Sequence, residues 1–581
     1  MAEIDENLRQ AVEAWIEDDP DSETREELTG LLERGEVEEI RDRFRGSLQF
    51  GTAGLRGLLG AGPNRMNRAV VLRTTAGLCA WIKQQVPDYR SRGVCIGYDG
   101  RRLSRELAAE AAAVVGAAGI KARVFDDVVP TPLLAYAVLD RRAAAGIMIT
   151  ASHNPPAYNG YKVYWENGAQ IIPPHDQGIA GSIRGVHSVT AIPRIDRAEA
   201  AARGLLEVLG EDIVSRYLDG VAGLGVHPET PRDVRIAYTA LHGVGEKLAR
   251  RALSEGGFDD VHSVASQAEP DGAFPTVSFP NPEEKGAMDR VLALAAEVDA
   301  DLVIANDPDA DRLAISVRES AGRYVSLNGN EIGCLLAHYL LDQREGEGRL
   351  VICSVVSSPM LGSIAEAHGA RFTQALTGFK WIANDAMRLE REQGLHFVFG
   401  YEEALGYTVG TLVRDKDGIS GAAVMADMAA WCKSRGRTLL DERDEMWRRY
   451  GLYLSRQISV VLPGAEGADR IDAIMEGVRE KPPTRLGPLE VVATSDLLSG
   501  TRKPRDGAPT ELDFPPSNVM ILDLEGANRV MLRPSGTEPK IKFYFDVRVE
   551  VGPGEGSDES RARGEKLLDA IVGDFRAAVA A

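Results

Sequence analysis

Residues 146–165, GIMITASHNPPAYNGYKVYW, decide the fold class of this chain. They open with an apolar β-type run at residues 147–150 and then change abruptly to small and turn-forming residues. This change predicts that Ser152 lies on a tight loop at the mouth of a strand. Strand-end loops are where α/β proteins place their chemistry, so we expect an α/β domain in which Ser152 is functional.

The neighbours of Ser152 favour a phosphate-binding loop. His153 and Asn154 can hold an oxyanion, and residues 159–160 turn the chain toward Lys162, which can neutralise one. An ordinary serine-rich turn explains the Ser-His pair alone equally well, but not the whole TASHNP string followed by YNGYK. These residues resemble the phosphoserine loop of the α-D-phosphohexomutase superfamily, which includes phosphoglucomutases, phosphomannomutases and a phosphopentomutase-like branch.

A second segment, FGTAGLRG at residues 50–57, resembles the corresponding segment of the phosphopentomutase-like branch almost letter for letter. Its glycines permit unusual backbone angles and close approach to a ligand. Arg56 is a forked donor suited to phosphate, and a long helical pattern follows at residues 70–86. We therefore expect Arg56 in the active site.

Composition limits the class of protein. At ~150 residues per domain, 581 residues suggest about four domains. The net charge of −20 disfavours nucleic acid and anionic membrane as partners, because both would be repelled. The five scattered cysteines lack CxxC spacing, as is typical of reduced thiols. The acidic N-terminus and the lack of any run of ~18 apolar residues predict a cytoplasmic protein without a membrane span.

Three βαβ-type units follow one another along the chain, at residues 93–125, 234–264 and 350–373. Each is followed by another apolar run that ends in a conspicuous loop, the first of which carries Ser152. The pattern predicts an α/β fold: three topologically similar α/β domains with mixed sheets, plus a smaller C-terminal α+β domain, around a central cleft.

The loop after the second unit, NDPDADR at residues 306–312, predicts a metal site. Asp307, Asp309 and Asp311 stand at alternate positions, so in an extended segment their carboxylates converge on one side. Three such anions repel one another unless a divalent cation neutralises them, and hard oxygen ligands select Mg²⁺ or a similar ion. A solvated acidic turn stays open as an alternative, whereas an EF-hand is excluded because arginines stand where it needs Gly and Glu.

This loop also resembles the superfamily's metal loop, although Pro308 and Ala310 replace its usual glycines. The resemblance implies that the three aspartates bind one Mg²⁺ per chain together with an oxygen of phosphorylated Ser152. It also implies that Arg312 supports the transferring phosphate.

Two strings after the third βαβ unit resemble substrate loops of the superfamily. In GFKW at residues 378–381, Lys380 corresponds to a positive side chain near the transferring phosphate, although alone it is as readily a surface lysine. GYEEALGY at residues 400–407 resembles the sugar-binding loop, in which paired carboxylates, here Glu402 and Glu403, grip vicinal hydroxyls. Tyr401 stands where the hexose enzymes usually have Gly, and Ala404 where they usually have Ser. These two differences favour the branch that handles pentose as well as hexose phosphates.

Two further strings carry cations. RDKDG at residues 414–418 adds Arg414 and Lys416 to the expected substrate contacts, unless it is a solvated turn. RPSGTEPKIK at residues 533–542 combines an Arg fork, hydroxyls and freed backbone N–H groups in an anion nest, although a plain turn is the alternative. The superfamily uses this string for the non-transferring phosphate, which implies binding by Arg533, Ser535, Gly536, Thr537 and Lys542.

Glycine, proline or polar linkers interrupt the periodicity near residues 225, 327 and 450. Residues 2–45 have apolar residues at helical spacing and predict amphipathic helices. The expected domains are residues 1–225 with this helical extension and the phosphoserine loop, 226–327 with the metal loop, 328–450 with the sugar loop, and 451–581 with the phosphate loop.

The resemblance, which covers about residues 46–548, implies a phosphosugar mutase that interconverts sugar 1-phosphates with hexose 6-phosphates or pentose 5-phosphates. Phosphoglucomutase activity is expected first, with phosphomannomutase or phosphopentomutase activity beside it. Phosphorylated Ser152 donates to the sugar, and the bound sugar bisphosphate turns end for end and returns its other phosphate. Lys162 and His153 both stay open as the general acid/base.

Three alternatives stay open: a glucose-1,6-bisphosphate synthase, a metal-dependent phosphatase and a non-catalytic phosphosugar-binding module. A GxSxG motif does not surround Ser152, which argues against an esterase triad. We expect Mg²⁺ as cofactor, a sugar bisphosphate such as glucose 1,6-bisphosphate as activator, and a small phosphosugar as partner. We expect no nucleic-acid or membrane partner, and a monomer or weak homo-oligomer.

Overall fold

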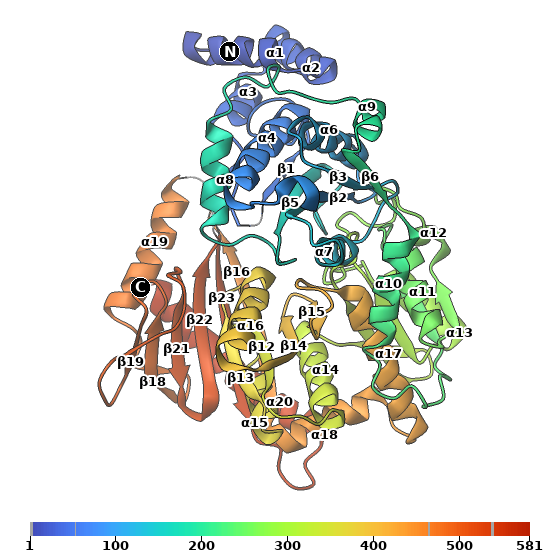
Figure 1. Cartoon of the computed structure of the whole chain (residues 1–581). Helices are drawn as coiled ribbons and strands as arrows, with labels where there is room; N and C mark the ends of the chain where they lie inside the picture. Colours follow the sequence, from blue (N-terminus) through green and yellow to red (C-terminus); the bar gives the residue numbers. More distant parts are fainter. Residues whose placement is uncertain (1–3, 53, 463–464, 536–539, 581) are drawn as a thin grey trace. The chain divides into compact units, whose positions relative to one another are not determined.

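The computed structural model describes residues 4–52, 54–462, 465–535 and 540–580 (Figure 1). The chain forms two compact units. The first comprises Met1–Asn328 and Leu405–Arg435, and the second comprises Gly329–Ala404 and Gly436–Ala581. The finer division into four domains, with boundaries near 225, 327 and 450, stays a prediction.

The first unit contains a mixed six-stranded sheet in the order β1-β5-β4-β2-β3-β6. Strand β5 runs antiparallel to both of its neighbours, whereas β2, β3, β4 and β6 run parallel. Every residue of β2 and β4 is buried, as expected for parallel strands covered on both faces. The strands are β1 (Leu55–Leu58), β2 (Val94–Tyr98), β3 (Ala122–Phe125), β4 (Ala145–Ile149), β5 (Tyr158–Trp165) and β6 (Leu206–Leu209).

Seven helices of the described chain accompany this sheet. Helices α4 and α6 pack against each other, α7 packs against β2 and β4, and α8 packs against α4. The bounds are α4 (Arg68–Gln85), α5 (Tyr89–Arg92), α6 (Ser104–Ala117), α7 (Thr131–Asp140), α8 (His175–Arg184), α9 (Arg197–Ala202) and α10 (Glu211–Ala222).

Three N-terminal helices, α1 (Glu6–Asp18), α2 (Ser22–Arg34) and α3 (Val37–Phe44), confirm the expected helical extension. Asp5 and Asp21 cap the first two by accepting hydrogen bonds from backbone N–H groups. Their apolar faces form a small core of their own, which includes Val12, Leu28 and Ile40. The extension therefore folds as a packed layer rather than as a tail.

The second sheet of the first unit has the order β11-β10-β9-β7-β8. Strands β7, β8 and β9 run parallel, and β10 and β11 continue the sheet in antiparallel pairs. Helix α17 belongs to this unit, since it packs against α11. The elements are β7 (Ile236–Thr239), α11 (Glu246–Glu255), β8 (Val261–Ser263), α12 (Ala265–Ala268), α13 (Asp289–Val298), β9 (Leu302–Ala305), β10 (Ala314–Ser320), β11 (Arg323–Ser326), β15 (Gly406–Val409) and α17 (Gly418–Ser434).

The second unit begins with a third α/β layer, in which β12 lies between β13 and β14 and runs parallel to both. Helix α16 contacts all three strands, and its apolar side chains join theirs in one core cluster. The elements are α14 (Gly329–Gln343), β12 (Arg349–Ser354), α15 (Met360–Ala367), β13 (Arg371–Ala375), α16 (Phe379–Gln393), β14 (His396–Glu402) and α18 (Leu439–Tyr450).

A C-terminal antiparallel sheet completes the second unit, in the order β16-β23-β22-β21-β18-β19-β20, with β17 paired to β18. Figure 1 shows its strands from β16 to β19. Helix α20 covers the sheet, and the Phe575 ring lies 5.3 Å from that of Phe543 and 5.4 Å from that of Phe545. The elements are β16 (Leu452–Val461), α19 (Ala465–Glu480), β17 (Arg485–Leu486), β18 (Leu489–Asp496), β19 (Thr501–Pro504), β20 (Thr510–Glu511), β21 (Met520–Leu524), η1 (Glu525–Ala527), β22 (Asn528–Pro534), β23 (Lys540–Val549) and α20 (Ser557–Ala580).

The fold class expected from the sequence is confirmed: three α/β layers precede a C-terminal sheet-rich domain. The three predicted βαβ units appear as β2-α6-β3, β7-α11-β8 and β12-α15-β13. All five cysteines are free and buried, as expected for reduced thiols. Among the described helices, none combines the length and the apolar composition needed to span a membrane.

Candidate active site

Ser152 lies in the loop between β4 and β5, as predicted. Its side chain is buried, at 3% exposure, and its backbone is in the left-handed region, with φ of 53°. This is an unusual conformation for a residue other than glycine. The Ser152 N–H donates to the Thr150 hydroxyl at 2.8 Å, which fixes the start of the turn.

Two polar groups contact the Ser152 hydroxyl. It donates to Asp307 Oδ2 at 3.0 Å, and its oxygen lies 3.1 Å from His153 Nδ1. Burial, followed by the charge of Arg312, holds the pKa of His153 well below its usual range. The imidazole is therefore neutral near pH 7. Because the Ser152 hydroxyl donates to Asp307, the His153 tautomer that fits is the one in which Nδ1–H donates to Ser152 Oγ.

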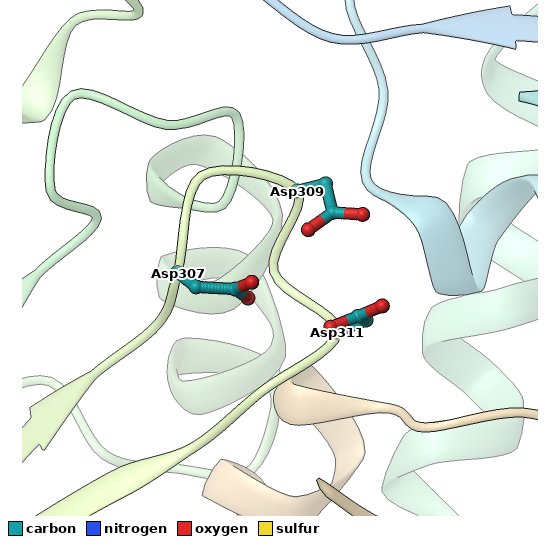
Figure 2. Close-up of side chains that lie close together, drawn as sticks. All are labelled: Asp307, Asp309 and Asp311. Atoms are coloured by element: carbon teal, nitrogen blue, oxygen red, sulfur yellow. The ribbon is translucent and has the colours of Figure 1, made fainter. Parts of the chain in front are cut away.

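Asp307, Asp309 and Asp311 lie close together on the turn that follows β9 (Figure 2). Their ligand atoms all lie within 4.8 Å of one another, and all three residues are buried. The predicted convergence is found, but its predicted cause, an extended segment, is wrong. The chain turns here, because the Ala310 N–H donates to the Asp307 carbonyl at 2.8 Å and Ala310 has φ of 54°.

The residues of this turn fit a divalent cation. Asp309 Oδ1 and Asp311 Oδ1 are buried and have no hydrogen-bond partner within the part of the chain that the structure describes. A buried carboxylate oxygen without a donor is costly, and a hard cation satisfies it. The other oxygens are paired, since Lys162 Nζ lies 2.8 Å from Asp309 Oδ2 and 3.0 Å from Asp311 Oδ2.

The buried charges shift one another's pKa values. Burial, together with the charges of Asp309 and Asp311, raises the pKa of Asp307 well above its usual range. Burial also disfavours ionised Asp309, but Lys162 outweighs it and lowers the Asp309 pKa. For Lys162 burial acts to lower the pKa, and the charges of Asp309 and Asp311 outweigh it and raise the pKa. Lys162 is therefore a charged partner of the carboxylates in this structure.

Arg56 and Arg312 also belong to this cluster. Arg56 lies on strand β1, and its Nη1 donates to Asn154 Oδ1 at 3.1 Å. Strand β1 reaches this place because Gly54 lies against β5, where a Cβ would come within 1.9 Å of the Tyr161 carbonyl oxygen. The Arg312 N–H donates to Asp307 Oδ1 at 3.0 Å.

The RDKDG string is held inside the first unit. Lys416 Nζ lies 3.2 Å from Asp311 Oδ2 and 3.3 Å from Asp415 Oδ1, and its side chain is 13% exposed. Arg414 donates to the Asn167 carbonyl at 3.0 Å. Lys416 thus contacts the metal turn directly, a contact that the expected role in substrate binding did not include.

Lys380 and the two glutamates lie in the second unit. Lys380 is in the first turn of α16, one residue after Phe379. Glu402 Oε1 accepts from the Gly378 N–H at 2.6 Å and so binds the segment that precedes α16. Glu403 Oε2 accepts from the hydroxyls of Ser354, at 3.0 Å, and Ser357, at 3.1 Å. One oxygen of each glutamate is therefore committed to the protein.

The expected phosphate loop connects β22 and β23 in the second unit. Arg533 pairs with Lys542 in the register of these strands, and the Ser535 N–H donates to the Lys540 carbonyl at 2.7 Å. Gly536 and Thr537 lie outside the described residues.

The sequence patterns missed three residues that contact this site: Arg101, Thr131 and Asp415. Arg101 follows the carboxyl end of β2, which is next to β4 in the sheet, so its place beside the Ser152 loop follows from the sheet order. The Thr131 hydroxyl donates to Asp309 Oδ2 at 2.6 Å, and Asp415 Oδ2 accepts from the Tyr164 hydroxyl and from Gln170 Nε2, both at 2.7 Å. These contacts join segments that are far apart in sequence, and a local pattern does not indicate them.

Three protein-family models match this chain in succession. They are described as phosphoglucomutase/phosphomannomutase, alpha/beta/alpha domain I, over residues 47–189, domain II over residues 215–322 and domain III over residues 328–450. Together they span more than half of the chain.

The chain belongs to the phosphoglucomutase/phosphomannomutase family. The resemblance to the α-D-phosphohexomutase superfamily is thereby confirmed. As a member of this family the chain is an isomerase, a phosphosugar mutase that acts as an intramolecular phosphotransferase.

Individual proteins that are named as mutases of this kind are also similar to the chain. A Haemophilus influenzae protein named "Probable phosphomannomutase" is 40% identical over 489 residues, which cover 83% of this chain and 93% of that protein. The phosphopentomutase of Mus musculus is 34% identical over 591 residues, which cover 98% of this chain and 94% of that protein. A crystal structure of a phosphoglucomutase/phosphomannomutase family protein from Burkholderia thailandensis shares the fold, with a TM-score of 0.66 at 19% identity over 91% of this chain and 96% of that one.

Proposed function

We propose that this mutase interconverts glucose 1-phosphate and glucose 6-phosphate through phosphorylated Ser152, and that it accepts mannose or pentose phosphates as further substrates. The observation that carries the proposal is the 3.0 Å hydrogen bond from Ser152 Oγ to Asp307 Oδ2. It joins a serine on a strained loop to a carboxylate 155 residues away, inside a cluster suited to a divalent cation.

Asp307, Asp309 and Asp311 would hold Mg²⁺, together with an oxygen of phosphorylated Ser152. When bound, the ion supplies charge neutralisation for the transferring phosphoryl group. The two unpaired Oδ1 atoms support this assignment, since they offer lone pairs that the described protein does not use.

The chain's own residues would transfer the proton and neutralise the remaining charges. When the phosphoryl group leaves Ser152, the serine oxygen takes up a proton and the accepting sugar hydroxyl loses one. Neutral His153, whose Nδ1 is 3.1 Å from Ser152 Oγ, would pass its Nδ1–H to the serine while its Nε2 takes up the proton that the sugar hydroxyl loses, so that the imidazole ends neutral. Lys162 balances the charges of Asp309 and Asp311. Arg56 and Arg312 neutralise the equatorial oxygens of the phosphoryl group.

Residues of the second unit would bind the substrate. Glu402 and Glu403, the paired carboxylates of the expected sugar loop, would accept hydrogen bonds from sugar hydroxyls. Lys380 would support the transferring phosphate, and the string at residues 533–542 would bind the other phosphate. The bound sugar bisphosphate forms when phosphorylated Ser152 donates to the sugar monophosphate, and added sugar bisphosphate would be the activator that first phosphorylates Ser152.

The test is a coupled assay of isomerisation with glucose, mannose, ribose and deoxyribose 1-phosphates, each with Mg²⁺ and trace sugar bisphosphate. We expect turnover of glucose 1-phosphate, and slower turnover of at least one other sugar. Bisphosphate that accumulates without isomerisation would instead identify a synthase. Stoichiometric release of inorganic phosphate would identify a phosphatase, and binding without turnover would identify a non-catalytic module.

A further inference from the structure

Arg101 makes an unusual set of contacts with the loop that carries Ser152. Its Nη2 donates to the carbonyl oxygens of Ser152, at 2.6 Å, and Asn154, at 2.5 Å. Its Nη1 donates to the carbonyl oxygens of Pro155, at 2.9 Å, and Tyr158, at 3.2 Å. One guanidinium group therefore binds three carbonyls of the loop and the carbonyl of Tyr158, the first residue of β5. The loop presents these carbonyls toward one point, where buried acceptors need a donor.

Arg101 is itself held rigidly from within the first α/β layer. The residue is 4% exposed, and its Nε lies 3.3 Å from Asp99 Oδ2. Asp99 Oδ1 accepts from the Arg101 N–H at 3.0 Å and from the Ser104 hydroxyl at 2.7 Å. Ser104 in turn accepts from Asn159 Nδ2 at 3.0 Å. The end of β2, the start of α6 and the start of β5 thus meet at this guanidinium.

The second α/β layer of the same unit covers the other side of Arg101. The guanidinium carbon lies 4.9 Å from the centroid of the Phe274 ring. Gly272 lies against the backbone, since a Cβ there would be 2.8 Å from both Arg101 Cα and the Arg102 nitrogen. Little room remains for the guanidinium to move, and a cation over an aromatic face is an attractive contact.

We propose that Arg101 is a positioning residue, which holds the Ser152 loop in the one conformation that presents Ser152 Oγ to Asp307. The inference rests on the proposed function of Ser152. Ser152 needs such a restraint because its left-handed backbone is disfavoured for an L-residue with a side chain. The planar fork of arginine can serve four carbonyls at once, whereas the compact ammonium of lysine cannot.

The first test is Arg101→Lys, with Arg102→Lys as matched control because the Arg102 side chain is exposed. In Arg101→Lys we expect kcat to fall about 100-fold, since small displacements of reacting groups cost about this much. We expect KM for the sugar phosphate to change by less than about threefold, because the substrate contacts stay in place. The rate at which a sugar bisphosphate phosphorylates Ser152 should fall as kcat does, and Arg102→Lys should match the wild type.

Two additional measurements separate positioning from general stability. Amide hydrogen exchange at residues 152–158 should become faster in Arg101→Lys while the melting temperature changes little. Phe274→Leu leaves the arginine in place and removes the ring, so we expect faster exchange in the same peptide and a fall of kcat of about fivefold, the range of one cation–π contact.

The outcomes decide the inference. A folded Arg101→Lys with kcat within threefold of the wild type would overturn it. If Arg101→Lys does not fold, Phe274→Leu decides: reduced kcat with faster exchange at residues 152–158 supports the inference, and wild-type values refute it. A wild-type protein that isomerises no sugar phosphate would count against the proposed function alone, because hydrogen exchange at residues 152–158 still tests the contact.

Discussion

Thr131 donates two hydrogen bonds to Asp309, from its hydroxyl to Oδ2 at 2.6 Å and from its backbone N–H to the Asp309 carbonyl at 2.9 Å. Thr131 is the first residue of α7, which packs against the six-stranded sheet of the first unit, and Asp309 belongs to the turn after β9. A helix N-terminus of one layer therefore orients a candidate metal ligand of the next. Partners of metal ligands affect metal affinity because they fix the orientation of the ligand.

Thr131→Val keeps the size of the side chain and removes the hydroxyl donor. We expect it to weaken Mg²⁺ binding about tenfold, the low end for loss of a partner of a metal ligand. Thr131→Ser keeps the donor and should bind as the wild type does. The measurement is Mg²⁺-dependent stabilisation against heat, checked by titration with Mn²⁺ followed by electron paramagnetic resonance. Equal affinity in Thr131→Val and Thr131→Ser would exclude this role.

Asp309→Asn tests the metal turn itself. It removes one charge from three carboxylates whose ligand atoms lie within 4.8 Å of one another, so we expect the Mg²⁺ concentration for half-maximal activity to rise at least about tenfold. Chelation of the metal should abolish wild-type activity, and added Mg²⁺ should restore it. An unchanged metal requirement in the variant would count against these carboxylates as ligands.

Lys416→Met tests the role of a buried cation. The change removes one buried partner of Asp311 and Asp415, while Lys162 still pairs with Asp311, so we expect a loss of stability of about 1–3 kcal/mol. Lys433→Met is the matched control, because its pair with Asp301, at 2.9 Å, has a lysine side chain that is 43% exposed, and such pairs contribute about 0–1 kcal/mol. Thermal unfolding measures both. If Lys416→Met instead raises KM and leaves the melting temperature unchanged, Lys416 acts on the substrate, as the sequence suggested.

The pKa of Asp18 predicts how the stability of the N-terminal helices depends on pH. Its carboxylate accepts hydrogen bonds from Ser188, Val189 and Thr190, and although burial raises its pKa, these bonds outweigh it and lower the pKa below its usual range. Because this pKa is lower in the folded than in the unfolded protein, the ionised carboxylate stabilises the fold at pH values above the unfolded pKa of ~3.9. This stabilisation is lost as the pH falls through the pKa of the folded protein.

We therefore expect Asp18→Asn to destabilise the N-terminal helices by about 1 kcal/mol at pH 7, after allowance for partial exposure. The difference from the wild type should shrink as the pH falls below about 4. Melting temperatures at pH 7 and pH 3 measure it, and a difference that does not depend on pH would show that the carboxylate charge does not contribute.

Much of the fold was predictable because local patterns determine it. The change from the apolar run of β4 to turn residues places Ser152 at a strand end, and the three βαβ patterns predict the three layers. The metal turn was predicted for a partly wrong reason, since Ala310 bends the chain where an extended segment was expected. Alternation in sequence identified the right carboxylates, but a turn brings them together.

Two contacts between distant segments, those of Thr131 and Lys416 with the metal turn, were not predictable. Thr131 meets Asp309 across 178 residues, and Lys416 meets Asp311 only because residues 405–435 pack in the first unit. Charged residues near a substrate and charged residues that neutralise a metal turn look alike in sequence. Their partners, which only the folded chain defines, distinguish the two roles.

The most direct test of the account is whether Ser152 carries the phosphoryl group. After incubation with Mg²⁺ and glucose 1,6-bisphosphate, mass analysis of the intact chain and its peptides should find one phosphate, on Ser152. Ser152→Ala should lose both the phosphate and turnover while its melting temperature stays close to that of the wild type. Normal mutase activity in Ser152→Ala, or a phosphate found on another residue, would contradict the account.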